Sequence, residues 1–493
     1  MRIVPRGEPD QHHRLVILTD MENEPDDAQT MVRLLMYSNE IDIEGLIAVT
    51  SRWVQDRVFP ESILTRVQAL GVIRDNLVKH AAGWPAPDYL ESRIAGGQLG
   101  FGMNAVGDGM STEGSELILS VLRSDDPRPV WFAINAGANT LAQALWDARR
   151  TLSGKLLEGL VRKIRVYDDS GQDNAGAWIA HEFPELFYIR SRAQVFGLYG
   201  PTFDLGPEPC APLDQYMWAE VNVRVGHGIL GALYPQRLWF VPPWNASPLP
   251  GPLHHFLEGG GTATWLGLVN KGLCDPEEIA WGGWGGRLSW DRQHVPAGQQ
   301  GVSETESPYE PFVMYPQDAD DSFKVGDPEK PVFSFSGVDG DEPYYPRDFA
   351  PLWRWRDAYT RDFRGRMDWC VQDYEHANHH PVPVLQGDGS RTIVRIAASA
   401  GETFELDASD SHDPDGDGLE FSWYQYPEAG TYADEVTLPT PHDSRISVRV
   451  PRDAAGTQIH VILELTDDSP IVPLTAYRRI VIDVGPLSRR GSR

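Results

Sequence analysis

One short stretch near the start of the chain constrains its fold more than any other, because it joins an apolar run to a cluster of acids. Residues 15–18 are all aliphatic, and Asp20, Glu22, Asp26 and Asp27 follow almost at once. Pro25 suits the first position of a helix, and apolar residues from 31 onward recur at helical spacing. The pattern predicts a buried strand, an acidic loop and an amphipathic helix.

Carboxylates gathered between a strand and a helix have two readings. They cap the helix, because acids in a first turn gain about 0.3 to 1 kcal/mol from its dipole, or they bind a hard cation or a polyol. Asp20 lies before the turn, at the carboxyl end of the predicted strand. Open α/β sheets place their ligands at that end. We therefore expect a catalytic site here.

Apolar runs alternate with amphipathic segments from residue 14 to about 285. This alternation indicates βαβ units, and so a doubly wound, mostly parallel sheet with helices on both faces. The runs read as buried strands are 15–18, 43–49, 130–134 and 164–167, and those read as helices include 115–122 and 140–146. Asn139 is expected to be the N-cap of the last of these.

The rest of the chain divides in two. Residues 286–380 are rich in Pro, Gly, Asp and aromatics, with a helical stretch near 348–374. We expect a layer that packs on the 1–285 domain, and the alternative is a surface that stacks on sugars. Residues 381–493 change to period two, which predicts an all-β immunoglobulin-like sandwich. Its acidic turn, 409–418, suits either plain turn geometry or an ion site.

Composition excludes several classes of function. The net charge of −28 repels phosphate backbones, so we expect no nucleic-acid partner. No stretch of about 18 apolar residues occurs, so we expect no membrane partner. The three cysteines are scattered, and no leader is evident, which favours a cytoplasmic protein unless a leader was removed. A homo-oligomer stays open.

The acidic loop resembles the Asp-rich loop of the nucleoside hydrolases. That resemblance implies that Asp20 binds Ca²⁺ and deprotonates water, that Asp26 binds the sugar, and that Asp27 is a second Ca²⁺ ligand. The longer loop, TDMENEPDD, is more similar to a sister family with a nucleoside hydrolase-like domain described as cellulose-binding. We also expect its Asn23 and Glu24 to contact substrate.

Segments at 45–51, 165–189, 270–287 and 354–369 fit the same sister family, so the resemblance spans nearly the whole chain. Residues 258–262 depart from it, because they read EGGGT where the resemblance implies Glu-Gly-Asp-Thr. The sandwich sequence LDASDSHDPDGDGLEFSW resembles PKD and cadherin-like modules of carbohydrate-active enzymes.

Further candidate residues are those with the chemistry that a sugar site needs. Amide and carboxylate groups bind vicinal hydroxyls and an indole packs on the ring, so we expect Gln172, Asp173, Asn174, Trp178 and Trp284 to bind substrate. Glycoside cleavage also needs an acid. Glu258 is preferred for that role, and the other candidates are His227, His254 and His255.

We therefore expect a glycosidase that uses a calcium-activated water on a furanosyl or related bond of a glycan-derived saccharide. One alternative is a carbohydrate-binding protein without catalysis, and another is a nucleoside hydrolase. A third is a scaffold that uses its sandwich for protein contacts. The first two differ at Asp20, since a protein that only binds sugar needs no water-activating carboxylate.

Overall fold

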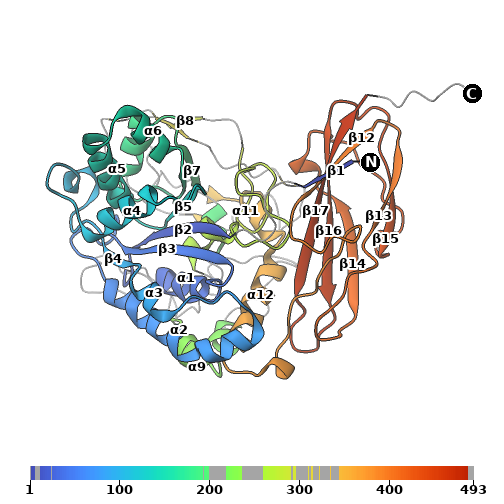
Figure 1. The fold of residues 1–493 in the computed structure, drawn as a ribbon, viewed down its shortest axis with the longest axis horizontal. Helices are drawn as coiled ribbons and strands as arrows, with labels where there is room; N and C mark the ends of the chain where they lie inside the picture. The colour runs from blue at the N-terminus through green and yellow to red at the C-terminus, as the bar shows by residue number, and fades with distance from the viewer. Residues whose placement is uncertain are drawn as a thin grey trace, which may run out of the picture.

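The computed structural model describes residues 2–5, 12–23, 25–191, 194–198, 218–235, 259–289, 293–295, 309, 312–314, 321, 333–334 and 343–486. They form a rounded α/β body and an elongated all-β part beside it (Figure 1). None of the helices formed by these residues combines the length and the hydrophobicity that a bilayer span needs.

The centre of the body is a six-stranded sheet in which every neighbouring pair is parallel. This confirms the predicted doubly wound sheet. In spatial order the strands are β4 (Ile94–Gly96), β3 (Ile41–Ala48), β2 (His13–Thr19), β5 (Val130–Ile134), β6 (Ile164–Asp169) and β7 (Phe187–Ser191). The strand order reverses between β2 and β5, and a sheet of this kind opens its ligand crevice at such a point.

Helices cover both faces of the sheet, and successive residues of β2 point alternately to two separate hydrophobic cores. The helices on one face are α1 (Pro25–Leu35), α2 (Pro60–His80), α3 (Pro87–Glu91) and α10 (Ala263–Leu266). Those on the other are α4 (Glu113–Arg123), α5 (Asn139–Thr151), α6 (Gly154–Val161) and α7 (Ala175–Glu182). The expected N-cap at Asn139 is wrong, because Ala138 caps α5 and the Asn139 amide instead donates to Thr50 and Gly100.

The described part of the aromatic-rich segment packs on the first of these cores. Its two helices are α11 (Pro346–Trp353) and α12 (Arg356–Asp368), and they bury Phe349, Trp353, Tyr359 and Phe363. The shorter elements are α9 (Gly228–Ala232), β8 (Gln293–Val295), β9 (Phe312–Met314), β10 (Phe333–Ser334) and β11 (Pro343–Tyr344).

The all-β part contains a five-stranded sheet and a two-stranded sheet around a third core. Its strands are β12 (Val394–Ser399), β13 (Thr403–Asp407), β14 (Leu419–Gln425), β15 (Arg445–Arg449), β16 (Gln458–Asp467) and β17 (Thr475–Gly485). The larger sheet also includes β1 (Arg2–Pro5), which pairs with β12. The expected α/β unit began at residue 1, whereas this strand crosses to the other domain (Figure 1).

Backbone hydrogen bonds join the two domains. The amides of Tyr477 and Arg479 on β17 donate to the carbonyls of Lys271 and Gly272, each at 2.9 Å. Gly272 has φ +82°, and a Cβ there would lie 2.1 Å from the Tyr477 carbonyl oxygen, so only glycine permits this approach. The all-β part is therefore docked on the body by β17.

Candidate functional site

The acidic loop lies at the carboxyl end of β2, where the predicted site was expected. Asp20, Asp26 and Asp27 are 3%, 5% and 5% exposed. Pro25 begins α1 as predicted, and this places Asp26 and Asp27 in the first helical turn. The Thr19 hydroxyl donates to Asp27, so the end of the strand and the start of the helix are tied together.

Glu22 shapes the middle of the loop. Its φ of 71° lies in the left-handed region, which residues other than glycine rarely adopt. Its carboxylate accepts a hydrogen bond from Ser62 in the first turn of α2, and Arg66 donates to the same hydroxyl at 2.7 Å. Helix α2 therefore holds the strained residue in place.

The electrostatics of the loop are those of acids crowded together out of water. Burial, followed by the charge of Asp26, raises the pKa of Asp27 to about 7. Burial, followed by the charge of Asp27, raises the pKa of Asp20 well above its usual range, although the Ser51 hydroxyl opposes the change. Such a cluster takes up protons or a cation to offset its charge.

A fourth carboxylate, which the sequence analysis did not single out, joins them. Asp169 ends β6, is 5% exposed, and accepts a hydrogen bond from Ser170 at 2.7 Å. Burial, followed by the charge of Asp26, raises its pKa well above the usual range. Its neighbour Asp168 is different, because Arg190 donates to it at 2.8 Å. The signal for Asp169 was its position at the carboxyl end of a strand, since it is the last residue of β6 and Asp20 directly follows β2.

Three polar atoms at this edge are buried and have no hydrogen-bond partner: Asp20 Oδ2, Asn135 Nδ2 and Gln172 Oε1. They follow β2, β5 and β6, which are adjacent strands. Asn135 and Gln172 are in contact, since Gln172 Nε2 donates to the Asn135 carbonyl at 2.8 Å. Leaving such groups unpaired costs about 1 to 3 kcal/mol each, so a polar ligand or an ordered water that bonded to them would stabilise the folded protein.

The glycine-rich loop closes over this edge. A Cβ at Gly259 would lie 2.3 Å from Thr30 Oγ1, and one at Gly261 would lie 2.1 Å from Asn135 Nδ2. Thr264 then donates to Asn135 Oδ1 at 2.8 Å. Both glycines are required for the loop to pack against α1 and the end of β5.

The segment after β6 mostly serves a structural purpose. Asp173 accepts from the amides of Ala175 at 2.9 Å and Asn139 at 3.2 Å, so it caps the starts of α7 and α5. Burial raises the pKa of Asp173 to about 6. Asn174 accepts from the amide of Met103 at 2.9 Å. Of the three polar residues predicted to bind sugar here, Gln172 alone presents an unpartnered buried atom.

Both tryptophans expected to bind sugar lie in hydrophobic cores. Trp178 is 2% exposed and packs between Trp146 and Phe183. Trp284 is 1% exposed and contacts Tyr359 and Tyr477 edge-on, where the body meets the all-β part. Neither indole face is open to a ligand, because neighbouring side chains already cover it.

Of the remaining candidates, two make structural contacts and four lie outside the described residues. His227 contacts Asp368 at the end of α12, 3.1 Å away, which is a structural pairing. Asn23 is 4% exposed, and its amide donates to the Asp20 carbonyl at 3.2 Å, so it closes the turn of the loop. Glu24, His254, His255 and Glu258 lie outside the described residues.

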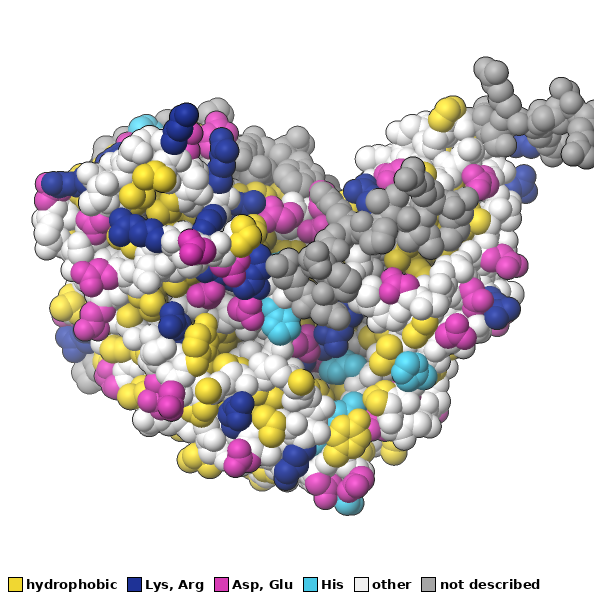
Figure 2. Space-filling view, in the orientation of Figure 1, with side chains coloured by type: hydrophobic (Ala, Val, Ile, Leu, Met, Phe, Trp, Pro, Cys, Tyr) yellow, Lys and Arg dark blue, Asp and Glu magenta, His cyan; other side chains and the backbone are white. Residues whose placement is uncertain are grey.

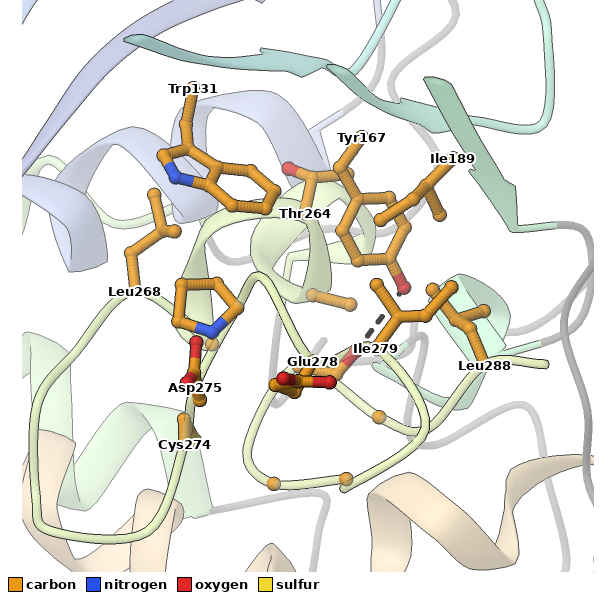
Figure 3. A pocket seen from close by; sticks show the side chains of 17 residues that line it. Trp131, Tyr167, Ile189, Thr264, Leu268, Cys274, Asp275, Glu278, Ile279 and Leu288 are labelled. Carbon is orange, nitrogen blue, oxygen red and sulfur yellow. Dashed lines mark hydrogen bonds between the residues drawn. The ribbon is translucent and has the colours of Figure 1, made fainter. Parts of the chain in front are cut away.

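A separate pocket lies beneath the sheet, on the face toward the all-β part. Trp131, Tyr167, Ile189 and Leu288 line it, and Tyr167 donates to the Gly285 carbonyl at 3.2 Å (Figure 3). Its volume is about 50 Å³, which holds a few water molecules at most. It is too small for a sugar, so the acidic edge remains the candidate site.

Comparisons with known proteins agree with this picture. Residues 14–288 match the family model for the nucleoside hydrolase-like domain of the cellulose-binding protein Sde182, and residues 403–484 match its C-terminal domain. A solved structure from Saccharophagus degradans, a nucleoside hydrolase-related hypothetical protein associated with carbohydrate metabolism, is 36% identical. The match covers 96% of this chain and 100% of that one, with a TM-score of 0.78.

A second solved structure, the effector protein XOO4466, is 11% identical, with a TM-score of 0.37 over 74% of this chain and 95% of that chain. A search of curated proteins finds no match.

Proposed function

The chain belongs to the family of cellulose-binding proteins that carry a nucleoside hydrolase-like domain, and we propose that it is a hydrolase of a furanosyl or related glycosidic bond in a glycan-derived saccharide. One observation carries the proposal. Asp20 places a buried, unpartnered carboxylate oxygen at the switch point of the sheet, among three further acids. A site that only binds neutral sugar does not need so costly an arrangement.

The donor set suits a hard divalent cation such as Ca²⁺. Asp20 and Asp27 are both buried and lie within hydrogen-bonding reach of each other. A bound Ca²⁺ would supply the positive charge that keeps these two carboxylates ionised at neutral pH. Asp26 and Asp169 add to the negative potential that attracts it.

The roles of the side chains follow from their positions. Asp20, once ionised, is placed to take a proton from the attacking water as general base. Asn135 Nδ2 is an unpartnered donor and Gln172 Oε1 an unpartnered acceptor, and both kinds of group suit the hydroxyls of a sugar ring. The Asp26 carboxylate is proposed to hold a ring hydroxyl. Glu258 remains our proposal for the acid that protonates the leaving group.

The test is hydrolysis of a panel of aryl furanosides, aryl pyranosides and nucleosides in the presence of calcium. We expect turnover of at least one substrate, and a loss of about 10²- to 10⁴-fold in Asp20→Asn, which keeps the shape but removes the base. Asp75→Asn, on the exposed side of α2, is the matched control and should leave the rate unchanged. Equal rates for wild type and Asp20→Asn would refute the proposed role.

The second candidate function is carbohydrate binding without catalysis. The observation that favours it is that Asn135 and Gln172 supply sugar-binding groups that need no chemistry. This function predicts that wild type turns over none of the panel yet binds an oligosaccharide, and that Asp20→Asn binds it with the same affinity. Calorimetric titration with cello-oligosaccharides distinguishes the two candidates.

A further inference from the structure

Two histidines meet where the all-β part joins the body. His80 is the last residue of α2, and His379 lies in the segment that leads from α12 into the all-β part. They are 8% and 6% exposed, and His80 Nδ1 lies 3.0 Å from His379 Nε2. Figure 2 shows histidine side chains gathered along this seam.

The outer nitrogens of the pair fix where its protons lie. His80 Nε2 lies 3.0 Å from the carbonyl oxygen of Gln372, and a carbonyl only accepts, so this nitrogen carries a hydrogen. His379 Nδ1 lies 2.9 Å from one carboxylate oxygen of Asp415 and 3.0 Å from the other. An ionised carboxylate also only accepts, so Nδ1 carries a hydrogen too.

The two inner nitrogens would then face each other as bare lone pairs if both rings were neutral. A contact of 3.0 Å between them requires a third proton, which one ring donates to the other. Asp415, His379 and His80 together therefore hold three protons in one hydrogen-bonded chain. The two rings share a single positive charge, which the Asp415 carboxylate balances.

The ring geometry decides between a proton and a metal ion as the bridge. The ring centres lie 5.2 Å apart and the two facing nitrogens lie 3.0 Å apart. The difference, about 2 Å, is close to the sum of the two ring radii. The nitrogens therefore lie on the line between the ring centres, and their lone pairs point at each other. An ion held at about 2.0 Å from both nitrogens would need lone pairs that converge to one side.

The surroundings favour the charged form. His379 stacks on Tyr374, with ring centres 3.8 Å apart, and Trp369 stacks on both histidines at 5.5 Å. Aromatic faces attract an imidazolium. Burial lowers the pKa of His80, and the hydrogen bond from its Nε2 to the Gln372 carbonyl acts in the opposite direction.

Two charged groups act on His80 in opposite directions, since Lys79 on α2 lowers its pKa and Asp373 raises it. Asp413 and Asp415, in the turn of the all-β part, act on Tyr374, which stacks on His379. The Asp413 carboxylate accepts from the amides of Asp415 at 2.8 Å and Asp417 at 3.2 Å, so it shapes the turn that presents Asp415. The acidic turn noted in the sequence thus supplies one end of the chain.

We propose that Asp415, His379 and His80 form a pH-sensitive clasp that fastens the acidic turn of the all-β part to the end of α2 and opens as the pH rises. Loss of the shared proton leaves two lone pairs in contact, and the rings move apart. The β17 contacts with Lys271 and Gly272 are made by backbone groups, which do not titrate, so they persist and the opening is local.

The clasp also forms one wall of a cavity between the domains. This cavity has a volume of about 490 Å³, and His80 and His379 line it together with Glu40, Asn270, His380 and Arg391. An open clasp therefore enlarges a polar space at the seam and leaves the acidic edge of the sheet untouched.

The experiment is hydrogen exchange of the full chain, followed by mass spectrometry, at about pH 5.5 and about pH 8. The quantity compared is the protection factor of peptides that cover residues 377–384 and 410–418, which is the intrinsic rate at each pH divided by the measured rate. In wild type we expect it to fall about tenfold or more, because a charge-assisted hydrogen bond contributes about 1.5 to 3 kcal/mol. The protection factor of peptides that cover β17 should be the same at both pH values.

Two variants remove the need for the third proton. In His80→Asn the amide can turn to donate or accept, and in His379→Gln the amide nitrogen donates to a neutral His80. Either should keep its protection within about threefold between the two pH values. The control, His181→Asn, replaces an exposed histidine on α7 and should behave like wild type.

Three results would overturn the proposal. One is protection of these peptides in wild type that does not depend on pH. Another is a fall in both variants equal to that of wild type. The third is protection that a chelator removes and zinc restores at a fixed pH, which would make a metal ion the bridge. If His80→Asn fails to fold, His379→Gln decides the question alone.

Discussion

Replacing Asp27 by asparagine tests whether the ionised carboxylates of the acidic loop destabilise the fold when no cation is bound. The pKa of Asp27 is about 7 in the folded protein, compared with 3.8 for an unhindered aspartate. The folded state therefore binds this proton more tightly than the unfolded state does, and folding stability falls as the pH rises from about 4 to about 7.

The difference is roughly three pH units, and at about 1.36 kcal/mol per unit it corresponds to at most about 4 kcal/mol of stability lost at neutral pH without a cation. The asparagine side chain has the shape of the protonated acid but cannot ionise. Asp27→Asn should therefore be more stable than wild type at about pH 7.5 in a chelator, by an amount that approaches this figure, and equal to it at about pH 4.

Calcium should reverse the order. Thermal unfolding by calorimetry at about pH 7.5, with a chelator or with millimolar calcium, should show a rise in Tm of several degrees for wild type and little or none for Asp27→Asn. Calcium that stabilises both proteins equally would place the ion elsewhere. A wild type as stable at about pH 7.5 in chelator as at about pH 5 would refute the reasoning about Asp27 itself.

Three further predictions concern residues that the structure assigns to packing and capping. Trp178→Ala should destabilise the protein by about 3 to 5 kcal/mol in denaturant titrations, with the sugar affinity of the folded fraction unchanged. Asp173→Ala should cost about 1 to 3 kcal/mol for each of the two amides that it leaves unpaired, and an unchanged urea midpoint would contradict its capping role. Residues 1–380 expressed alone should melt at a lower temperature than the full chain and self-associate, because the surface around Trp284 loses its cover.

The strand, loop and helix at the start of the chain could be predicted because their signals are local. Four aliphatic residues in a row, a proline at the first helical position and apolar residues at helical spacing each depend only on near neighbours. The parallel sheet followed from repeating that pattern. The position of Asp20 at the sheet edge came from the same reasoning.

The roles of Asp173 and Trp178 could not be predicted in this way. A buried carboxylate satisfies a sugar hydroxyl or a backbone amide equally well, and which one it meets depends on where the start of α5 lies. Helix α7 is apolar almost all round, so its sequence does not reveal that Trp178 faces a core. The pairing of β1 with β12 joins residues about 390 positions apart, and nothing local in Arg2–Pro5 indicates it.

The glycine-rich loop shows how sequence and structure together limit the chemistry. Gly259 and Gly261 are required by steric contact with Thr30 and with Asn135, respectively. Gly260 stands where the family resemblance implies an aspartate, so this loop has one carboxylate fewer than that resemblance implies. Asp169 brings a carboxylate to the same charge cluster from β6, since its pKa responds to both Asp26 and Asp27. Asp169 therefore adds to the negative potential on which the proposed cation site depends.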